Sequence, residues 1–171
     1  MDTNYIVELY DNRQHHIKDF QCGIYELDRY IKERAGQESR KGITAVYIMR
    51  EKISMRVIGY YTLSSCSIQL NSLTEDIKKK LPRYEALPAA LIGRLAVDMN
   101  FHGRRIGEQM LVDALNRSYI LSKQIAIFAV VVDAKDEKSR NFYERYGFLR
   151  TLEQPLKLYI PMGTIKKLIA P

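Results

Sequence analysis

The stretch that decides the fold is residues 91–109, LIGRLAVDMNFHGRRIGEQ. An apolar run typical of a strand ends at Asp98, a turn and a basic loop follow, and an amphipathic helix begins near Gly107. This order brings backbone N–H groups, two guanidinium groups and a helix N-terminus together, as a pyrophosphate site requires. The sequence therefore predicts a phosphate-binding loop. The alternative is an ordinary helix start with solvated arginines.

The loop differs from the two best-known phosphate motifs. Gly103 and Gly107 are separated by Arg104-Arg105-Ile106, and no Gly-Lys-Ser/Thr follows, so a Walker A loop is excluded. The G-x-G-x-x-G dinucleotide fingerprint is absent as well. After the loop, small and apolar residues recur at helical spacing on one face. They are Gly107, Met110, Leu111, Ala114, Leu115 and Ser118.

A second segment begins with residues 125–134, IAIFAVVVDA, whose β-branched composition predicts a strand buried on both faces. Acidic residues from Asp136 onward suit a helix N-terminus, and Gly147 suits the left-handed residue past the end of that helix. Phe142 and Tyr146 are four positions apart and share one helical face. Tyr143 lies one position round from Phe142 and need not share its burial.

The rest of the chain supplies further strands and helices in order. A short amphipathic helix is expected over residues 24–31, and residues 73–81 read as helical or irregular before Pro82. Strands are expected at residues 44–49, 57–63 and 156–160. Strands that alternate with helices predict an α/β fold, with a mixed sheet covered on both faces.

Length and composition predict one domain over residues 1–171. The chain is 46% hydrophobic and contains no run of 18 apolar residues, so no transmembrane helix is expected. The N-terminus lacks the charged-then-apolar pattern of a signal peptide. Two cysteines imply neither a disulfide framework nor a metal site. We expect a cytoplasmic protein that uses no metal and does not associate with a membrane.

The charge balance is a second functional clue. Lys and Arg number 27 against 20 acidic residues, which gives a net charge of +7. The basic residues cluster at 29–41, at 78–83 and around the predicted loop, and tyrosines are interleaved with them. An RNA partner would supply a matching line of phosphates. The alternative is a solvated basic surface, with part of the charge serving a phosphorylated cofactor.

The two segments together resemble the acetyl-CoA-binding half of the GNAT N-acetyltransferases. In that family a bulged strand leads to a loop written Gln/Arg-x-x-Gly-x-Gly/Ala, whose amides hold the CoA pyrophosphate. Residues 104–109, RRIGEQ, match except that Gln109 replaces Gly or Ala. Residues 141–148, NFYERYGF, are similar to the family's Asn-x-x-Phe-Tyr-x-x-x-Gly-Phe ending.

The resemblance implies a single-domain GNAT fold, with a mixed, mostly antiparallel sheet of about six or seven strands and helices on both faces. It also implies acetyl-CoA as acetyl donor. The residues that the resemblance assigns to acetyl-CoA are Leu95, Ala96, Val97, Gly103, Arg104, Arg105, Ile106, Gly107, Glu108 and Asn141.

Within this family, residues 94–103, residues 131–135 and the first helix resemble the toxins of toxin–antitoxin pairs. Such toxins acetylate the amino group of aminoacyl-tRNA. The similarity extends from about residue 5 to about residue 162. It implies aminoacyl-tRNA as substrate, a block of translation, a small DNA-binding antitoxin and a homodimer. The candidate RNA-binding residues are Arg29, Lys32, Arg40, Lys41, Arg83 and Arg94.

Amide formation from acetyl-CoA releases CoA thiolate, and a phenol placed beside the sulfur can give that thiolate its proton. Tyr143 is the candidate general acid because of its position in the Phe142-Tyr143 pair. A backbone amide near Leu95 or Ala96 is the candidate group to polarise the thioester carbonyl. No general base stands out. Two other functions remain open: a GNAT enzyme for a small amine or a protein amino group, and a non-catalytic acyl-CoA- or RNA-binding protein in which Tyr143 only packs.

Overall fold

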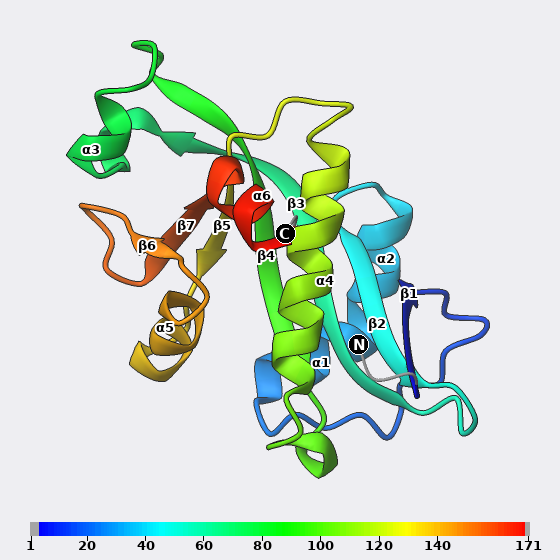
Figure 1. Cartoon of the computed structure of the whole chain (residues 1–171). Helices are drawn as coiled ribbons and strands as arrows, with labels where there is room; N and C mark the ends of the chain where they lie inside the picture. Colours follow the sequence, from blue (N-terminus) through cyan, green and yellow to red (C-terminus); the bar gives the residue numbers. More distant parts are fainter. Residues whose placement is uncertain (1–3, 170–171) are drawn as a thin grey trace. The chain divides into compact units, whose positions relative to one another are not determined.

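The computed structural model describes residues 4–169, which form a mixed sheet and six α-helices (Figure 1). The seven strands are hydrogen-bonded in the order β1-β2-β3-β4-β5-β7-β6. Four of the described strand pairs are antiparallel, and β4 pairs with β5 in parallel. The predicted mixed, mostly antiparallel sheet is therefore confirmed.

The strands are β1 (Tyr5–Leu9), β2 (Ala45–Glu51), β3 (Val57–Gln69), β4 (Ala86–Val97), β5 (Ala129–Asp133), β6 (Leu149–Arg150) and β7 (Lys157–Pro161). The helices are α1 (Tyr25–Glu33), α2 (Ala35–Arg40), α3 (Glu75–Lys78), α4 (Ile106–Leu121), α5 (Glu137–Glu144) and α6 (Met162–Ile169), with 3-10 helices η1 (Leu70–Ser72) and η2 (Met99–Phe101).

The chain divides into two compact units. Unit 1 comprises Met1–Ser64 and Gly93–Ala114, and unit 2 comprises Ser65–Ile92 and Leu115–Pro171. Strands β3 and β4 and helix α4 contribute residues to both units. Each unit has a hydrophobic core of its own, so each is described separately.

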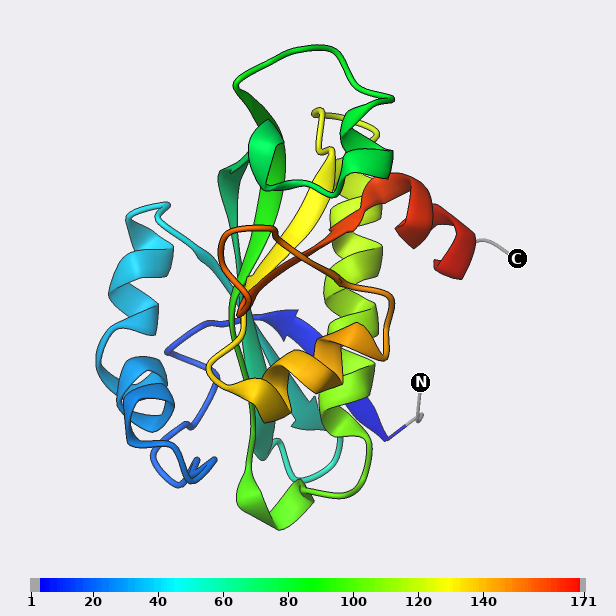
Figure 2. The same ribbon diagram turned by 90° about the vertical axis from the view of Figure 1, so that its left-hand side faces the viewer.

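In unit 1, α1 and α2 cover one face of the strands (Figure 2). Tyr30 and Ile31 of α1 are buried against Val46 and Ile48 of β2 and Tyr60 of β3. Alternate residues of a strand point to the same face, which explains why positions 46 and 48 share this core. The turn before α1 is fixed separately, because the Asp28 carboxylate accepts a hydrogen bond of 2.7 Å from the Cys22 N–H.

The first turns of α4 pack on the other face of unit 1. They approach β3 closely at Gly59, where a Cβ would lie 2.8 Å from the Met110 side chain and 3.0 Å from the Ala96 carbonyl oxygen. The Tyr61 hydroxyl donates a hydrogen bond of 2.5 Å to the buried Asp113 carboxylate on α4. Helices therefore cover both faces of the sheet here, as the resemblance implied.

In unit 2, β5 lies between β4 and β7. Ala89 pairs with Ala129 in parallel register, and Val131 pairs with Tyr159 in antiparallel register. Tyr159 is fully buried, and its hydroxyl accepts a hydrogen bond of 3.0 Å from the Thr74 N–H at the start of α3. This bond attaches the segment between β3 and β4 to the core of unit 2.

The strand predicted over residues 125–134 is shorter than expected. The structure limits it to β5, Ala129–Asp133, and Ile125 is 61% exposed. The reason is local: the Ile125 N–H donates to the Leu121 carbonyl at 3.0 Å and so continues the turn that ends α4. Regular pairing of β5 begins only after Phe128, whose N–H donates to the Pro88 carbonyl at 2.8 Å.

Within residues 4–169, no helix is both long enough and apolar enough to span a membrane. The same residues contain no cluster of three or more His, Cys, Asp or Glu side chains suited to a metal ion. Cys22 and Cys66 are free thiols, and burial raises the pKa of Cys22 to about 12.

Candidate functional site

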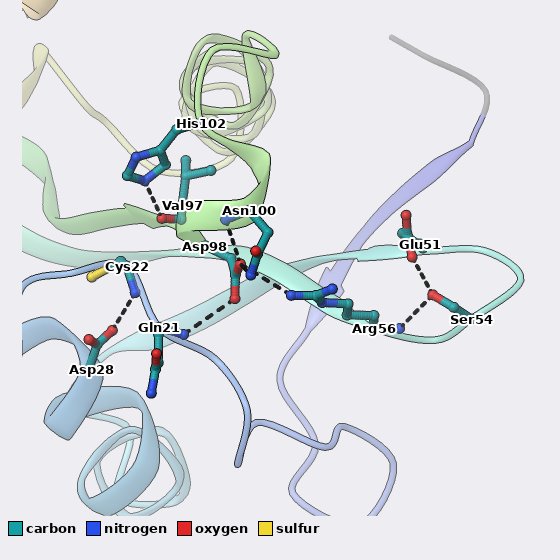
Figure 3. Close-up of polar contacts among 10 residues, drawn as sticks. All are labelled: Gln21, Cys22, Asp28, Glu51, Ser54, Arg56, Val97, Asp98, Asn100 and His102. Atoms are coloured by element: carbon teal, nitrogen blue, oxygen red, sulfur yellow. Dashed lines mark hydrogen bonds and ion pairs between the residues drawn. The ribbon is translucent and has the colours of Figure 1, made fainter.

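At the end of β4, in unit 1, the buried carboxylate of Asp98 organises the chain before the predicted phosphate loop (Figure 3). It accepts hydrogen bonds from the backbone N–H of Asn100 at 3.0 Å and from the side-chain amide of Asn100 at 2.9 Å. The Gln21 N–H and the Arg56 guanidinium each donate at 3.3 Å. Burial raises the pKa of this carboxyl, but the hydrogen bonds and the charge of Arg56 outweigh it, and the pKa is lowered. Asp98 therefore remains ionised and fixes the turn.

The backbone expected to meet the cofactor's pantetheine arm precedes this turn. Ala96 is buried, while Leu95 and Val97 are half-buried. His102 lies just beyond, and its Nε2 is 2.8 Å from the Val97 carbonyl oxygen (Figure 3). A carbonyl only accepts hydrogen bonds, so Nε2 carries the proton and Nδ1 does not in neutral His102. His102 thus closes the turn.

The basic loop itself is exposed and contains two left-handed residues. Gly103 has φ +77° and Arg105 has φ +57°, one on each side of Arg104. No atom lies within 4 Å of a Cβ built on Gly103, so the backbone there faces open space. The Arg104 guanidinium stacks on the ring of Phe101, 4.9 Å from its centroid. The loop therefore presents backbone and positive charge outward together.

The amides that could hold a pyrophosphate belong to the first turn of α4. The first hydrogen bond of this helix runs from the Gln109 N–H to the Arg105 carbonyl at 3.1 Å. The N–H groups of Ile106, Gly107 and Glu108 precede it and have no acceptor within the helix. Ile106 is buried, whereas Gly107 and Glu108 are half-buried. These three N–H groups, with Arg104 and Arg105 nearby in the chain, are the kinds of donor by which helix N-termini bind anions in other proteins.

Gln109, the departure from the family's loop, has a buried side-chain carbonyl oxygen. This oxygen has no hydrogen-bond donor among the described residues. A Gly or Ala at the same position would place no polar group there. The substitution leaves the N–H groups of the preceding turn unchanged.

Tyr143 lies in unit 2, on α5, in an apolar and aromatic environment. The Asp136 side chain caps this helix by accepting a hydrogen bond of 2.7 Å from the Ser139 N–H. Tyr143 is 8% exposed and packs against Phe142 and Phe148, with ring centroids 5.1 Å and 5.4 Å away. Tyr143 does not share the burial of Phe142, as its position on the helix allowed: Tyr143 is buried, whereas Phe142 is half-buried. Burial raises its pKa to about 12.

Asn141, the one predicted acetyl-CoA residue in unit 2, is exposed on α5. With Lys138, Glu144 and Arg145 it lines a shallow surface hollow of about 780 Å³. The helix ends as predicted, with Gly147 at φ +87°, a conformation that glycine adopts without a Cβ penalty. Asn141 and Tyr143 therefore lie on different faces of α5, one toward solvent and one toward the core of unit 2.

Five of the six candidate RNA-binding residues belong to unit 1. Lys32, Arg40 and Lys41 are exposed on α1 and at the end of α2. Arg29 is exposed as well, but its guanidinium pairs with Glu33 at 2.7 Å, one turn along α1. Such an exposed pair contributes little to stability. Lys32, Arg40 and Lys41 form no ion pair with any residue in the range 4–169.

Arg94 is held differently from the other basic residues. Its guanidinium carbon lies 3.6 Å from the centroid of the Tyr30 ring. Tyr30 is 3% exposed, and its hydroxyl donates a hydrogen bond of 2.9 Å to Glu38. Arg94 itself is half-buried next to Leu95 on β4. Neither Tyr30 as a support for Arg94 nor Arg56 as the partner of Asp98 was predicted, since no spacing in the sequence links these positions.

Arg83, the sixth candidate, lies in unit 2 between α3 and β4. It is exposed, and it lines a pocket together with Lys78, Lys79 and Tyr84. The structure thus does not gather the six basic residues into one unit.

Comparison with known proteins identifies the family. A family model described as an acetyltransferase (GNAT) domain matches residues 85–163, which include the loop and Tyr143. The chain is 32% identical over 171 residues to a protein of Sinorhizobium fredii named probable toxin TacT, covering 96% of this chain and 94% of that protein. It is 29% identical over 153 residues to the tRNA-acetylating toxin of Mycobacterium tuberculosis, covering 90% of each.

Solved structures agree with the sequence relatives. The structure of AtaT complexed with acetyl-methionyl-tRNAfMet superimposes with a TM-score of 0.90 and 26% identity, covering 98% of this chain and all of that one (100%). The structure of AtaTR bound with acetyl-CoA gives a TM-score of 0.85 and 27% identity, covering 99% and 100%. The matching family model and the 32% identical relative show that the chain belongs to the GNAT acetyltransferase family.

Proposed function

We propose that this protein is an acetyl-CoA-dependent N-acetyltransferase that acetylates the α-amino group of aminoacyl-tRNA and thereby blocks translation. The observation that carries the proposal is the joint likeness, over nearly the whole chain, to a tRNA-acetylating toxin and to AtaT complexed with acetyl-methionyl-tRNAfMet. The net charge of +7 and the exposed Lys32, Arg40 and Lys41 support an RNA substrate.

The residues of unit 1 fit acetyl-CoA. The N–H groups of Ile106, Gly107 and Glu108 and the guanidinium groups of Arg104 and Arg105 would hold its pyrophosphate. The open space beside Gly103 supports close approach of a ligand to the backbone. The strand Leu95–Val97 would pair with the pantetheine arm. In unit 2, Asn141 of α5 is proposed as a further acetyl-CoA-binding residue. Acetyl-CoA supplies the activated acetyl group as a thioester.

Tyr143 is proposed as the general acid. Its buried phenol has a pKa raised to about 12, so it holds its proton at neutral pH and can give it to the departing sulfur. A backbone amide near Leu95 or Ala96 would donate a hydrogen bond to the carbonyl oxygen as charge develops there. The proton that the attacking amine loses passes to solvent, and Tyr143 regains a proton from solvent once CoA has left as the thiol. An α-amino group ionises near pH 8, compared with about 10.4 for lysine, so a useful fraction is neutral without a dedicated base.

The partners follow from the same proposal. A toxin requires a protein that neutralises it, and we propose that a small DNA-binding antitoxin has this role. We also propose that two copies of this chain form a homodimer. The proposed site of action is the cytoplasm, where aminoacyl-tRNA is used. The name toxin on the Sinorhizobium relative supports the first of these. We also propose that residues 1–171 act as one domain, because β3, β4 and α4 contribute to both units. A single cooperative unfolding transition, seen alike by two probes, would support that.

The decisive experiment incubates the protein with radiolabelled acetyl-CoA and three acceptors: a charged tRNA pool, the same pool after deacylation, and a mixture of free amines and proteins. The proposal is supported if label appears only with charged tRNA and if deacylation of that tRNA releases the label together with the amino acid. Label on free amines or proteins would instead identify a small-amine or protein acetyltransferase. No label on any acceptor, despite acetyl-CoA binding, would favour a non-catalytic binding protein.

A further inference from the structure

Arg83 lies at a pocket in unit 2, between α3 and the start of β4. The pocket has a volume of about 590 Å³, which is in the range of sites for small ligands. Its walls come from η1, α3 and the loop that leads to Ala86, the first residue of β4. It is a feature of unit 2 alone, separate from the phosphate loop of unit 1.

The floor of this pocket is fixed by the core of unit 2. Leu73 is fully buried, and Ile77 and Leu81 pack against the same cluster. The Leu70 N–H donates a hydrogen bond of 3.0 Å to the Glu85 carbonyl and so joins the two ends of the segment. The pocket is therefore formed in the free protein, and binding need not order it.

The charged groups of the pocket favour a phosphate. Lys79 and Arg83 are exposed, whereas Lys78 is paired with Glu75 at 2.5 Å. Glu85 is the acidic residue in the lining. In the described part of the chain, Lys79 and Arg83 form no ion pair. The lining therefore has two unpaired cations and one carboxylate, which leaves the pocket positive.

An exposed aromatic ring completes the pocket. Tyr84 is 63% exposed, and its N–H donates to the Pro82 carbonyl at 2.9 Å, which tightens the turn that carries it. An exposed ring beside cations is the arrangement by which proteins bind single-stranded nucleic acid: bases stack on the ring and basic side chains contact the backbone. The apolar Leu70 and Leu81 in the lining suit the face of such a base.

We propose that this pocket binds one nucleotide of an RNA strand, with the base stacked on Tyr84 and a phosphate held by Lys79 and Arg83. Asn71 and Glu85 line the same pocket and can hydrogen-bond to the edge of the base. Naming tRNA as the source of this nucleotide rests on the proposed function. A free nucleotide offers the same chemistry, and the experiment separates the two sources.

The pocket is remote from Tyr143 within unit 2. Because β4 and β5 run in parallel, with Ala89 opposite Ala129, the start of β4 and the end of β5 lie at opposite ends of these strands. The rise of about 3.3 Å per residue separates those ends by roughly 20 Å. Both views place α3 and α5 at these opposite ends (Figures 1 and 2). The pocket would therefore bind a nucleotide of the tRNA that is distant from the aminoacylated end.

The test measures the affinity of the full-length protein for fluorescently labelled, uncharged tRNA at several salt concentrations. Tyr84→Ala is expected to weaken binding roughly 5- to 100-fold, the effect of removing one base–aromatic stack, while Tyr84→Phe stays within about twofold. Lys79→Ala and Arg83→Ala should each lower the salt slope by about one. Lys80→Ala is the matched control, because Lys80 is exposed next to Lys79 but does not line the pocket.

Three results would overturn the proposal. Equal changes in slope for Lys79→Ala and Lys80→Ala would leave only general surface charge. Tyr84-dependent binding of AMP or CMP, with unchanged tRNA affinity, would assign the pocket to a free nucleotide. Acetylation assays distinguish a failure of this proposal from a failure of the proposed function. If the wild-type protein acetylates charged tRNA and Tyr84→Ala has the same KM for that tRNA, only the proposal for the pocket is contradicted. A protein that binds tRNA through Tyr84 but acetylates none contradicts the function alone.

Discussion

The guanidinium carbon of Arg94 lies over the ring of Tyr30, 3.6 Å from its centroid, while Tyr30 stacks in turn on Tyr60. Stacking on a ring leaves the edge of a guanidinium available, and that edge matches a phosphate in a two-bond geometry that lysine cannot reproduce. Arg94 is thus held in place before any substrate binds, on the strand next to Leu95.

We therefore expect Arg94→Lys, which keeps the charge, to weaken tRNA binding about tenfold, corresponding to about 1.4 kcal/mol. Tyr30→Phe keeps the ring and removes only the hydrogen bond to Glu38, so it should bind tRNA like the wild type. Anisotropy titrations of both variants, with calorimetry of CoA binding as a control, check this. Equal affinities of Arg94→Lys and the wild type would reduce Arg94 to a diffuse positive charge.

The close packing of α4 on β3 makes a prediction about stability. A methyl group at Gly59 would lie 2.8 Å from Met110 and 3.0 Å from the Ala96 carbonyl, so Gly59→Ala should lower the free energy of unfolding by about 1–3 kcal/mol. Gly163→Ala is the control, because its Cβ meets nothing within 4 Å in α6. That variant should be unchanged or stabilised by about 0.5–1 kcal/mol. Urea unfolding measures both, and equal stabilities would contradict the packing argument.

Asp98 should make stability depend on pH. Its pKa is lowered in the folded protein, so its contribution is present above the unfolded value of about 3.9 and is lost as pH falls through the folded pKa. Asp98→Asn is expected to be less stable by about 1–3 kcal/mol at pH 7, an estimate that allows for the solvent exposure of Arg56. The difference in free energy of unfolding between Asp98→Asn and the wild type should become smaller below pH 4. A gap that is the same at pH 7 and pH 3 would mean that the carboxylate charge is not what matters.

The sequence predicted the elements whose residues carry a strong local pattern. β5, α4 and the capped start of α5 follow from β-branched runs, helical spacing and Asp136. It did not predict α2, whose sequence AGQESR has no apolar face, or the two-residue β6. The sequence wrongly predicted a strand at residues 125–128, because a short apolar run has the same pattern in a strand and in an irregular segment.

The loop of the candidate site was predictable, but its supports were not. Glycines, arginines and a helix start are consecutive in the chain, and so the sequence displays them together. The contacts of Asp98 with Arg56, and of Arg94 with Tyr30, join residues that are 42 and 64 positions apart in the sequence. Only the pairing of strands and the packing of α1 bring such residues together, and no local pattern records that.

Gly107→Val tests the cofactor site. A branched side chain on the first turn of α4 would occupy the space that a phosphate needs to reach the N–H groups of residues 106–108. Valine is a better helix former than glycine, so the helix should persist. We expect the CoA affinity measured by calorimetry to fall at least about tenfold, an effect of 1.4 kcal/mol. Gly163→Val, the same change on α6, should not alter it, and equal affinities of the two variants would remove Gly107 from the site.

Tyr143→Phe tests the chemistry. The ring keeps its contacts with Phe142 and Phe148, so the fold and CoA binding should survive, as calorimetry and circular dichroism would report. Turnover of aminoacyl-tRNA should fall about 10²- to 10⁴-fold, the usual contribution of a general acid. Because burial raises the pKa of this phenol to about 12, the wild-type rate should not decline near pH 10, where an exposed tyrosine would lose its proton. A variant that retains turnover within about threefold, a change of less than 1 kcal/mol in the barrier, would show that the thiolate leaves without this proton and that Tyr143 only packs the core of unit 2.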